Sequence, residues 1–486
     1  MAASISAVRS AAVDGRLLNP IFRKEQLQKL HEKLSQNSAD IQATILRDTG
    51  YSKAEVTAEY WLAIKLVKDA YDALSHDASL RDEYRIAKSQ NAPDGREPVG
   101  IVVIEPARHA YLFSLLSALI PALAAGNCII VKIEQDMLAT PGLVLRLIGE
   151  ALDSDIFLAT RDQVTNDTLG HHRSMTVLQN GSPEAALASH VVSEPLTRTI
   201  AVVERDADLK LAARELTRAR FALRGHSPYA PDLVYVNEWV KKNFLAALAE
   251  EAIRMSPHPH PGASGQSDRP TVSRQLQDRI AHDRNASIVS SNGTGVVVDV
   301  DEKSTLLSGE KISEPVLVVH AVRSIDAAID IANKTGRLGA AYVFAQPAAA
   351  KYICQFINAP LSIVNHVPAK LLFHPMAPRT LTAHSNPFRP YDELLFSLTK
   401  AHFVNPPSDY NMLERALSLG KPELLEPLTR AASRLAPFKR AEGRPDIGFF
   451  EQGIITGGVM LLSTVFTVTG VCCYYWMGVP MFLRRL

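Results

Sequence analysis

Hydrophobic and polar residues follow two patterns along the chain, and the first is helical. From about Asn19 to Ser75, apolar residues recur at every third or fourth position, as in FRKEQLQKLHEKL and AEYWLAIKLVKDAYDAL. This spacing predicts successive amphipathic helices. The segment from Met1 to Arg16 is interpreted as a helix or arm of small residues, because it lacks the basic, apolar and cleavage regions of a signal peptide.

The second pattern consists of short apolar runs that alternate with helical segments. Helices are predicted between most of the runs, for example at Asp208–Leu223 and Ser324–Lys334. Because the runs are apolar on both faces, they predict an α/β protein with largely parallel sheets. The predicted strands are Gly100–Ile104, Cys128–Lys132, Thr176–Gln179, Thr199–Val203, Asp232–Val236, Gly295–Val300, Pro315–Val319, Ala341–Phe344 and Ser362–Asn365.

Two polar stretches interrupt or follow this alternation. Ser256–Arg269 is rich in Pro, Gly and Ser, which predicts an exposed loop. Residues from about Pro406 to Phe449 are polar and helical in patches, and they are predicted to connect the folded body to the segment that follows.

That segment, Gly453–Trp476, carries no charged residue. A helix of about 24 residues is roughly 36 Å long, which is enough to cross a hydrocarbon core of about 30 Å. The aromatic residues at 474–476 suit a membrane interface, and the arginines at 484 and 485 suit water. A buried core helix is the alternative, but core helices rarely run this long without charge. We therefore predict a single membrane span.

Only about ten residues follow the predicted span, which favours insertion after translation and a tail-anchored protein whose soluble body faces the cytosol. The span and its short Arg-Arg tail fit the endoplasmic reticulum, and mitochondrial or peroxisomal outer surfaces are alternatives. Cys472 and Cys473 in the span are interpreted as packing residues or palmitoylation sites.

Composition narrows the class of protein. The length of 486 residues predicts about two or three domains, and 47% apolar with 21% charged residues excludes a disordered chain. A net charge of +1 gives no electrostatic reason to bind nucleic acid. Four cysteines fit a reducing compartment rather than a disulfide scaffold. His258 and His260 lack nearby carboxylates or thiols, so no metal site is predicted.

A colinear series of segments covers most of residues 10–400. The segments are GRLLNPIFRKEQLQKL (15–30), EPVGIVVIEP (97–106), LIPALAAGNCIIVK (119–132), NGSPEAA (180–186), AVVERDADLKLAA (201–213), YAPDLVYV (229–236), EPVLVVHAVRSIDAAIDIAN (314–333) and AAYVFA (340–345). Their order resembles the aldehyde dehydrogenase superfamily, most closely its fatty-aldehyde branch, some members of which carry a C-terminal membrane anchor.

The resemblance implies a domain plan and partners. Residues 1–205 would form a Rossmann-type cofactor domain, 206–375 an α/β catalytic domain and 376–405 the remnant of a small bridging arm. A linker at 406–452 and a transmembrane helix at 453–477 would follow. The family implies NAD or NADP as cofactor, a homodimer and a hydrophobic small molecule as ligand.

The resemblance also locates the position of the catalytic nucleophile. In the family a cysteine thiolate attacks the aldehyde, and its loop here corresponds to LRGHSP, which places Pro228 at the nucleophile position. Proline also lacks the backbone N–H that would help to hold an oxyanion. The family's second oxyanion donor, an asparagine, corresponds to His109. Ser227 beside His226 suggests a hydrolase only weakly, and two ordinary loop side chains are the preferred interpretation.

Other family positions are altered as well. Glu194 corresponds to the general base, but Leu196 and Thr197 replace the two glycines that follow it. Lys311 replaces the glutamate that would bind the nicotinamide ribose, and residues 375–388 replace a glycine-rich stretch. The positions that match the family's cofactor contacts are Lys132 for the adenosine ribose, and Gly181 and Ser182 for the pyrophosphate turn, whose second glycine is Ala186.

Three functions follow from this comparison. The first is a tail-anchored, aldehyde-dehydrogenase-like protein that lacks aldehyde oxidation and binds a hydrophobic ligand or a protein partner. The alternative is an active NAD(P)-dependent oxidoreductase that oxidises hydrophobic aldehydes at the membrane, which would require a nucleophile-independent mechanism or a cysteine contributed from elsewhere. Cys128 and Cys354 are predicted to face the core. The third is a decaying gene product.

Overall fold

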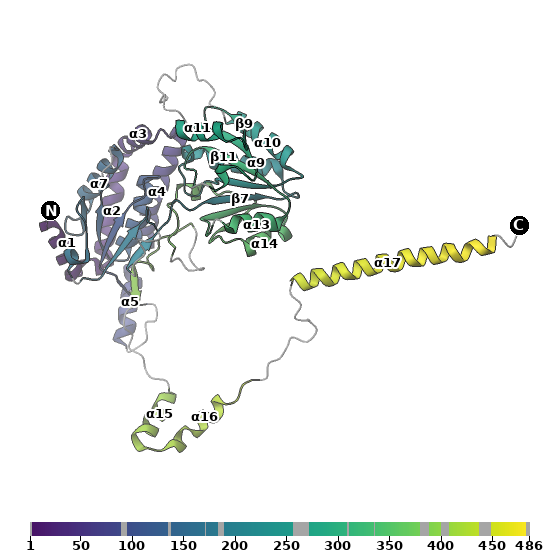
Figure 1. Ribbon diagram of the computed structural model, residues 1–486. Coiled ribbons are helices and arrows are strands. Elements are labelled where there is room, and N and C mark those ends of the chain that lie inside the picture. Colours follow the sequence, from purple (N-terminus) through teal and green to yellow (C-terminus); the bar gives the residue numbers. More distant parts are fainter. Residues whose placement is uncertain are drawn as a thin grey trace. The chain divides into compact units, whose positions relative to one another are not determined.

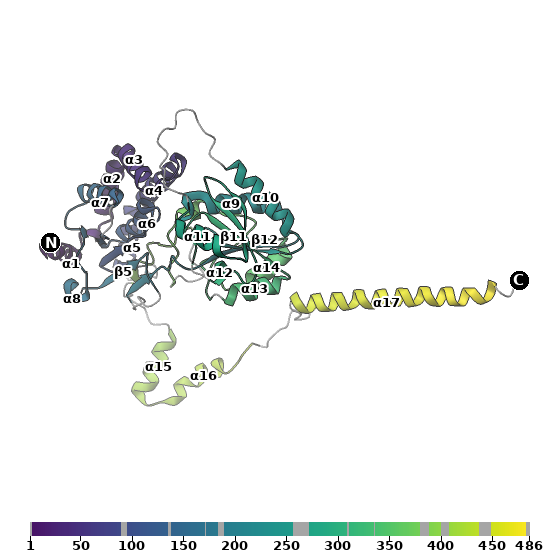
Figure 2. The same cartoon turned by 45° about the horizontal axis from the view of Figure 1, so that its top comes forward.

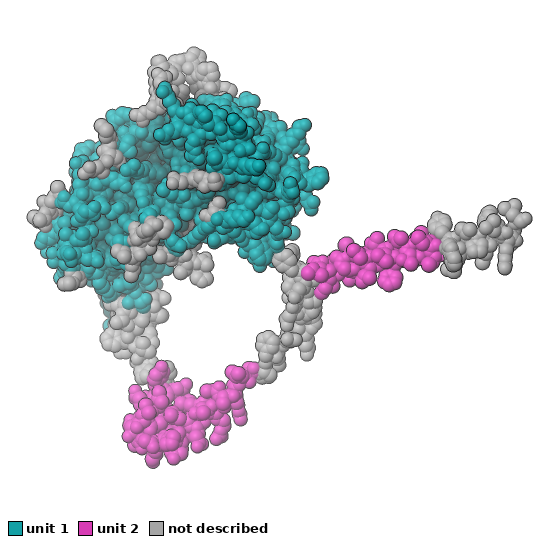
Figure 3. All heavy atoms as spheres, in the orientation of Figure 1, with its two compact units in different colours: residues 1–403 teal, residues 404–486 magenta. Residues whose placement is uncertain are grey.

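The chain forms two compact units, residues 1–403 and 404–486, which Figure 3 colours separately. A computed structural model describes residues 2–88, 95–134, 138–170, 172–182, 189–255, 272–308, 311–334, 336–379, 388–399, 408–436 and 449–482. The predicted loop Ser256–Arg269 therefore lies outside the described residues. The first unit contains both large sheets, and the second contains helices.

A five-stranded, all-parallel sheet occupies the first half of the body. Three of its strands are apolar runs, and burial on both faces explains their near-continuous hydrophobic character. Its order is β4 (Phe157–Thr160), β3 (Cys128–Lys132), β2 (Ile101–Glu105), β5 (Ser174–Leu178) and β6 (His190–Val192).

Amphipathic helices cover this sheet. Helices α1 (Ala2–Asp14), α6 (Tyr111–Ala124) and α7 (Ala139–Ala151) contact its strands. The apolar stripes of α2 (Pro20–Gln36) and α4 (Lys53–Ala73) pack against each other and, respectively, against α7 and α6. The remaining N-terminal helices are α3 (Ser38–Thr49) and α5 (His76–Ala87).

The N-termini of the long helices are capped by side chains, as their sequences favour. The Asn19 side chain accepts a hydrogen bond from the Ile21 backbone at the start of α2. Ser52 and Glu55 form a reciprocal capping box at the start of α4. These caps fix the entry points of two helices, of which α4 contacts the candidate site through Glu55.

A seven-stranded sheet forms the second half of the body. All neighbouring pairs are parallel except β9 with β10. The order is β13 (Ser362–Val364), β12 (Ala340–Phe344), β7 (Thr199–Val203), β8 (Leu233–Asn237), β11 (Val316–Val322), β10 (Val296–Val300) and β9 (Ala286–Ser291).

Residues of each central strand alternate between two hydrophobic cores. Ala201 and Val203 join the core that contains α9 (Leu209–Phe221) and α10 (Lys241–Arg254), whereas Ile200 and Val202 join the other. The second core includes residues of α11 (Arg274–His282), α13 (Ile325–Lys334) and α14 (Pro347–Phe356). Figures 1 and 2 show α13 and α14 on the opposite side of the sheet from α9 and α10.

A two-stranded antiparallel ribbon joins β1 (Arg96–Pro98) to β14 (Ser397–Thr399). Its second strand, β14, lies within the segment 376–405 that the sequence assigns to an arm, of which residues 380–387 and 400–405 lie outside the described residues. The Arg96 guanidinium donates to the Ser397 side chain at 2.6 Å and to the Leu394 carbonyl at 2.8 Å. These bonds hold the two distant segments together.

The nine predicted strands all form, with ends shifted by at most three residues. The prediction missed strands β1, β4, β6, β9 and β14, because they are short or carry polar residues on an edge. One further difference concerns the domain plan. Strand β7 lies in the seven-stranded sheet, so the change of sheet falls between β6 and β7, before the boundary that the sequence places at residue 205.

The second unit contains three α-helices in its described part, α15 (Ser408–Leu419), α16 (Glu426–Ala432) and α17 (Phe449–Phe482). The first two confirm helical patches in the predicted linker. Within α17, Gln452–Tyr474 is long and apolar enough to cross a membrane, with a mean hydropathy of 1.8, and none of its most apolar stretch is buried.

Candidate functional site

The loop that corresponds to the family's nucleophile loop begins with an unusual backbone turn. After α9, the short helix η3 (Ala222–Gly225) contains Leu223 and Arg224 at φ values of 50° and 52°, followed by Gly225 at 72°. Left-handed conformations are costly for residues other than glycine, so surrounding contacts must hold this turn. One contact is visible: the Leu223 backbone N–H donates to a Glu55 carboxylate oxygen of α4 at 2.7 Å.

Gly225 lies in the same turn, and the structure gives it a packing role. A Cβ atom at this position would overlap the backbone of Glu314 and Pro315, at the start of β11. The positive φ disfavours any side chain as well. Gly225 therefore lets the loop lie directly on the segment that precedes β11.

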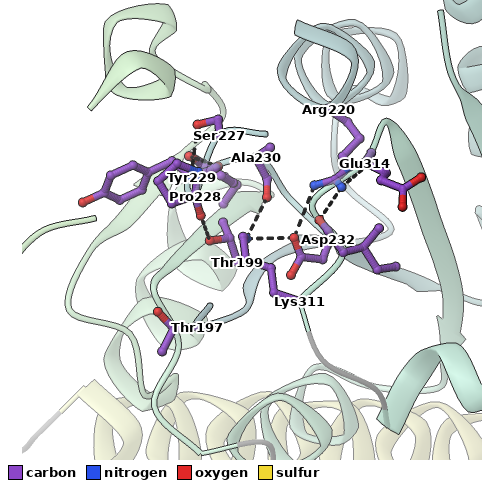
Figure 4. Close-up of polar contacts among 12 residues, drawn as sticks. Thr197, Thr199, Arg220, Ser227, Pro228, Tyr229, Ala230, Asp232, Lys311 and Glu314 are labelled. Carbon is purple, nitrogen blue, oxygen red and sulfur yellow. Dashed lines mark hydrogen bonds and ion pairs between the residues drawn. The ribbon is translucent and has the colours of Figure 1, made fainter. Parts of the chain in front are cut away.

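Pro228 itself is buried and faces inward as part of a closed hydrogen-bonded turn (Figure 4). Its carbonyl oxygen accepts from the Thr199 hydroxyl at 2.9 Å. Ser227 is also buried, and its hydroxyl oxygen accepts from the Tyr229 backbone at 3.2 Å. The Ser227 hydroxyl is therefore hydrogen-bonded within the loop. Among the described residues it forms no hydrogen bond with His226.

A buried ion cluster lies behind this loop, and the sequence analysis missed it. The Asp232 carboxylate is 2.9 Å from the Lys311 ammonium and 3.3 Å from the Arg220 guanidinium, and the side chains of Asp232 and Arg220 are fully buried. Figure 4 shows Lys311 directed at Asp232 and Ala230. Lys311 therefore has a partner inside the protein rather than one in a cofactor site.

Burial and charge act against each other in this cluster. Desolvation lowers the pKa of Lys311, and lowers that of Arg220 to about 10, while the Asp232 carboxylate raises both. Arg220 also donates to the carbonyls of Ile312 and Glu314. Two cations share one carboxylate, so Asp232 holds the nucleophile-position loop, β8 and the segment before β11 together.

His109, at the oxyanion-donor position, points to another part of the chain. Its Nε2 atom is 2.7 Å from the Leu372 carbonyl oxygen, and its Nδ1 atom has no partner. Burial lowers the pKa of His109 to about 4, so the ring is neutral near pH 7. A neutral ring bonded to Leu372 through its N–H has that donor already occupied.

Glu194, at the general-base position, forms an ion pair. Its carboxylate is 3.1 Å from the guanidinium of Arg379, whose backbone N–H donates to the Val192 carbonyl at 3.0 Å. Arg379 comes from the segment that replaces the family's glycine-rich stretch, so this partner is another residue that the sequence analysis missed. Thr197 donates its hydroxyl to the Glu194 carbonyl and lies against Gly339.

At the positions that match the family's cofactor contacts, other residues of the protein already occupy part of the space and of the hydrogen-bonding groups. The Lys132 ammonium is 2.8 Å from the Glu105 carboxylate and 3.5 Å from the Gln163 side chain. Gly181 and Ser182 follow β5, and a Cβ on Gly181 would overlap the Val192 side chain. Ala186, with the rest of residues 183–188, lies outside the described residues.

Among the described residues, the two cysteines of the body lie on β3 and α14 and not in the loop that contains Pro228. Cys128 starts β3 and borders a cavity of about 710 Å³ at the amino ends of β2 and β3, the opposite end of these strands from Glu105 and Lys132. Burial raises its pKa to about 12. Cys354 lies on α14, and burial raises its pKa too. Both thiols are therefore protonated near pH 7 and poor nucleophiles.

The described part of the chain contains no candidate metal-binding site. There, no group of three or more His, Cys, Asp or Glu side chains could hold a metal ion. His258 and His260 lie outside the described residues.

Comparison with known proteins identifies relatives of the whole body. A family model described as "Aldehyde dehydrogenase family" matches residues 1–373. The chain is 24% identical to "Aldehyde dehydrogenase, dimeric NADP-preferring" of Rattus norvegicus, over 70% of this chain and 80% of the relative. It is also 24% identical to "Aldehyde dehydrogenase family 3 member A2" of Macaca fascicularis, over 71% and 75%.

Solved structures share the fold. The substrate-bound state of Staphylococcus aureus AldH aligns with a TM-score of 0.64 at 18% identity, covering 86% of this chain and 99% of that one. The NAD-dependent benzaldehyde dehydrogenase of Corynebacterium glutamicum aligns with a TM-score of 0.60 at 16% identity, covering 84% and 88%. These likenesses confirm the α/β fold that the sequence predicts.

Proposed function

The chain belongs to the aldehyde dehydrogenase family, and from this premise we propose that it is a membrane-anchored member that does not oxidise aldehydes. Its body would bind a hydrophobic molecule or a protein partner at the membrane surface. Pro228 carries this proposal. A side chain without a thiol or hydroxyl, on a residue without a backbone N–H, can supply neither the nucleophile nor the oxyanion donor that the family's chemistry needs.

The residues around Pro228 support the same proposal. Loss of a covalent nucleophile typically costs on the order of a million-fold in turnover, and here the neighbouring groups have other partners as well. The Glu194 carboxylate is paired with Arg379, so a proton acceptor there would first have to leave a guanidinium. Cys128 and Cys354 offer protonated thiols in other parts of the body, the first of them buried.

We extend the proposal to the cofactor: the described residues do not fit a nicotinamide dinucleotide. The Lys132 ammonium is neutralised by Glu105, and the residue in place of the ribose-binding glutamate, Lys311, is paired internally with Asp232. Some relatives are named for their use of NAD or NADP, but those names are not evidence that this chain binds either cofactor. No step through the cofactor is derived for it.

Membrane attachment through α17 completes the proposal. Its apolar stretch supports a single span, and the unpaired cysteines support a body that faces the reducing cytosol. We assign the endoplasmic reticulum as the membrane and a homodimer as the assembly, the latter by analogy with the relative named as dimeric.

Calorimetry and product analysis test the proposal. The full chain in detergent is titrated with NAD, NADH, NADP and NADPH, and is then incubated with decanal and either oxidised cofactor. We expect no decanoate above the background without protein. Decanoate that forms in proportion to the chain would refute the proposal.

A Pro228→Cys variant sharpens this test. It restores the thiol and the backbone N–H, but it leaves Glu194 paired with Arg379 and Lys311 paired with Asp232. We therefore expect no aldehyde-dependent NADH from this variant. Appreciable turnover would mean that the site had lost only its nucleophile.

One observation favours the second candidate, an active oxidoreductase for hydrophobic aldehydes. The relatives are named as dehydrogenases, and one Staphylococcus aureus relative at 26% identity is named for a long apolar aldehyde, 4,4'-diaponeurosporen-aldehyde. Decanoate formation by the full chain that survives Cys128→Ala and Cys354→Ala would favour this candidate over the first.

A further inference from the structure

A cavity of about 710 Å³ lies at the amino ends of β2 and β3, whereas the positions that match the family's cofactor contacts follow the carboxyl ends of the same sheet. Its walls come from the end of α1, the short helix η1 (Arg16–Leu18), the start of α2 and the segments that carry the β1–β14 ribbon. Small-molecule sites typically occupy about 300–1,000 Å³. None of the described lining residues belongs to the loop of Pro228. We call this space the amino-edge cavity.

Apolar side chains are exposed around the amino-edge cavity. Val13 at the end of α1 is 72% exposed, Leu18 in η1 is 59% exposed, and Leu394 before β14 is 60% exposed. One exposed apolar residue is ordinary, but three that line the same cavity offer a shared apolar surface. The described lining residues include no Phe, Tyr or Trp on which an aromatic ligand could stack. The lining therefore favours an aliphatic chain.

Charged side chains line the same cavity, and positive charge is in excess. The three cations are Arg23, Arg96 and Arg173, and the two carboxylates are Glu97 and Glu393. Arg173 and Glu97 neutralise each other in an ion pair at 2.6 Å. Two arginines thus remain against one glutamate, which leaves one positive charge without a counter-charge among the described lining residues.

Arg96 bonds only to neutral groups. Its Nε atom donates to the Ser397 hydroxyl at 2.6 Å, and its Nη2 atom donates to the carbonyls of Leu394 and Ser397 at 2.8 and 2.6 Å. In the part of the chain that the structure describes, its Nη1 atom forms no hydrogen bond and no carboxylate lies within ion-pair distance. The guanidinium is therefore held in place and keeps both its charge and a donor for a ligand.

Arg23 is in a similar position on the other side of the Glu393–Leu394 turn. It donates to the carbonyls of Ala124 and Leu18. Glu393 interacts with it electrostatically, but these two described side chains form no ion pair. Both arginines are thus fixed by backbone carbonyls close to one turn, without a carboxylate in direct contact.

The excess of one positive charge restricts the head group of a ligand. An ammonium would add to the excess, and a hydroxyl would leave it uncompensated. A head group with one negative charge matches it, and anionic oxygens form strong, charge-assisted hydrogen bonds with guanidinium donors. The lining thus selects an aliphatic chain that ends in a singly charged oxygen anion.

We propose that the amino-edge cavity binds such an anionic amphiphile, with its head group at Arg96 and Arg23 and its chain along Val13, Leu18 and Leu394. A free fatty carboxylate and an anionic phospholipid share this chemistry. The inference rests on the proposed function, because it names the class of hydrophobic molecule that the body binds and the place where it binds. It involves no bond-making step.

Titration calorimetry of octanoate into the full chain in dioleoylphosphatidylcholine nanodiscs tests the proposal, with empty nanodiscs as the background. The comparison probes 1-octanol and octylammonium have the same chain length but no negative charge. We expect saturable binding of octanoate, and binding of both comparison probes that is weaker by about tenfold or more, the loss expected without a charge-assisted hydrogen bond.

Arg96→Gln removes the charge at the head group and is expected to weaken octanoate binding about tenfold. Its matched control is Arg146→Gln, since Arg146 lies outside the cavity in an exposed pair with Glu150. Arg96 also joins the ribbon, so thermal unfolding is measured for each variant to show that it is folded.

Leu394→Asp provides a second variant that leaves the side chain of Arg96 in place. It puts a negative charge and a polar group where the chain and head group meet, so octanoate is again expected to bind about tenfold more weakly. Because Leu394 is exposed, the substitution is expected to leave the fold intact. Ile253→Asp on α10 is the control, at an apolar residue that is 68% exposed and outside the cavity.

Equal octanoate affinity in Leu394→Asp and Ile253→Asp would overturn the proposal. Absence of saturable octanoate binding would also overturn it, and so would 1-octanol or octylammonium binding at least as tightly. A repeat in nanodiscs that contain dioleoylphosphatidylglycerol distinguishes the two sources: weaker octanoate binding there supports a lipid head group as the occupant, and unchanged binding supports a free fatty carboxylate. Decanoate formation from decanal, measured separately, bears on the proposed function alone.

Discussion

Asp232 is the residue on which the loop around Pro228 most depends. It is the one carboxylate within ion-pair distance of both Arg220 and Lys311 in the described part of the chain. Breaking a buried ion cluster by removing one partner is expensive, because the remaining charges stay buried without compensation. Here two cations would remain.

Asp232→Asn is therefore predicted to lower the free energy of unfolding by about 3–5 kcal/mol. Urea denaturation of the full chain, followed by circular dichroism, measures this change. The matched control is Asp72→Asn, which removes the carboxylate of an exposed pair with Lys68 and is expected to change stability little. Equal effects of the two substitutions would mean that the buried cluster carries no special weight.

His374 predicts a pH dependence with a definite sign. Its pKa is lowered from 6.5 to about 3, so between these values the unfolded chain binds a proton that the folded chain does not. Stability is therefore lost as the pH falls below about 6.5. Glu59 acts in the opposite direction, because its pKa is raised from 4.5 to about 7. It is present both in the natural chain and in the His374→Phe variant with which the natural chain is compared below.

The comparison is between the natural chain and His374→Phe, which has no proton to bind at this position. The difference in melting temperature between the two is predicted to widen as the pH falls from 7 to 4.5, with the variant more stable in acid. His109 and Lys370, which interact electrostatically with His374, remain in both. A difference that is constant with pH would contradict the burial of a neutral imidazole.

Residues that act through long-range contacts could not be predicted from the sequence. Its resemblance to the family proposes Pro228 for the nucleophile position, and that assignment stays a prediction. Asp232, Arg379 and Glu59 have no motif of their own, and their roles depend on partners that lie far away in the sequence. Lys311, a cation in place of the family's glutamate, was a usable signal of the ion cluster, because a buried cation requires a carboxylate nearby.

At the scale of elements, the turn in η3 places three residues in succession at positive φ, and two of them, Leu223 and Arg224, carry side chains that make this conformation costly. Gly225 is the only one of them without a side chain, and the backbone of Glu314 and Pro315 fills the space that a Cβ would occupy. Packing against the start of β11 therefore determines the backbone conformation of η3 as much as its own sequence does.

Gly225→Ala is predicted to destabilise the protein by clearly more than the roughly 1 kcal/mol typical of a left-handed alanine. Gly336→Ala is the control, since Gly336 also has a positive φ of 92° but would place its Cβ in open space. Chemical denaturation of both variants checks the difference. Matching losses of stability would show that backbone conformation alone, without the overlap, determines the cost.

Most elements followed from hydrophobic periodicity, and the exceptions have a common cause. Strands such as β7 and β3 are buried on both faces and appear as apolar runs. Edge strand β9 exposes half its residues, so its pattern resembles a polar loop. Strand order within the sheets cannot be derived from periodicity, because pairing depends on crossovers rather than on local sequence.

At the scale of the molecule, α17 is expected to determine where the protein resides. Leu461→Arg combined with Leu462→Arg introduces two charges into its apolar stretch, each costing about 2.5–3.5 kcal/mol near the middle of a membrane helix. The double variant is predicted to shift from the membrane fraction to the soluble fraction on carbonate extraction. Leu417→Arg on α15, at a residue of similar exposure, is the control. Retention of the double variant in membranes would rule out α17 as the anchor.

The overall architecture was predictable because the order of segments along the chain resembles one family, and the family model and solved structures confirm it. The placement of β7 was not, because a strand at a domain boundary looks the same whichever sheet it joins. The two sheets of the fold are thus present, and Pro228 lies in the connection between β7 and β8.

The most direct measurement is a search for carboxylic acid product by mass spectrometry, using the full chain at high concentration with decanal and either NAD or NADP. The proposed loss of the nucleophile at Pro228 predicts decanoate at the level of the protein-free background, even over many hours. Decanoate that rises in proportion to the amount of chain and requires the cofactor would contradict it.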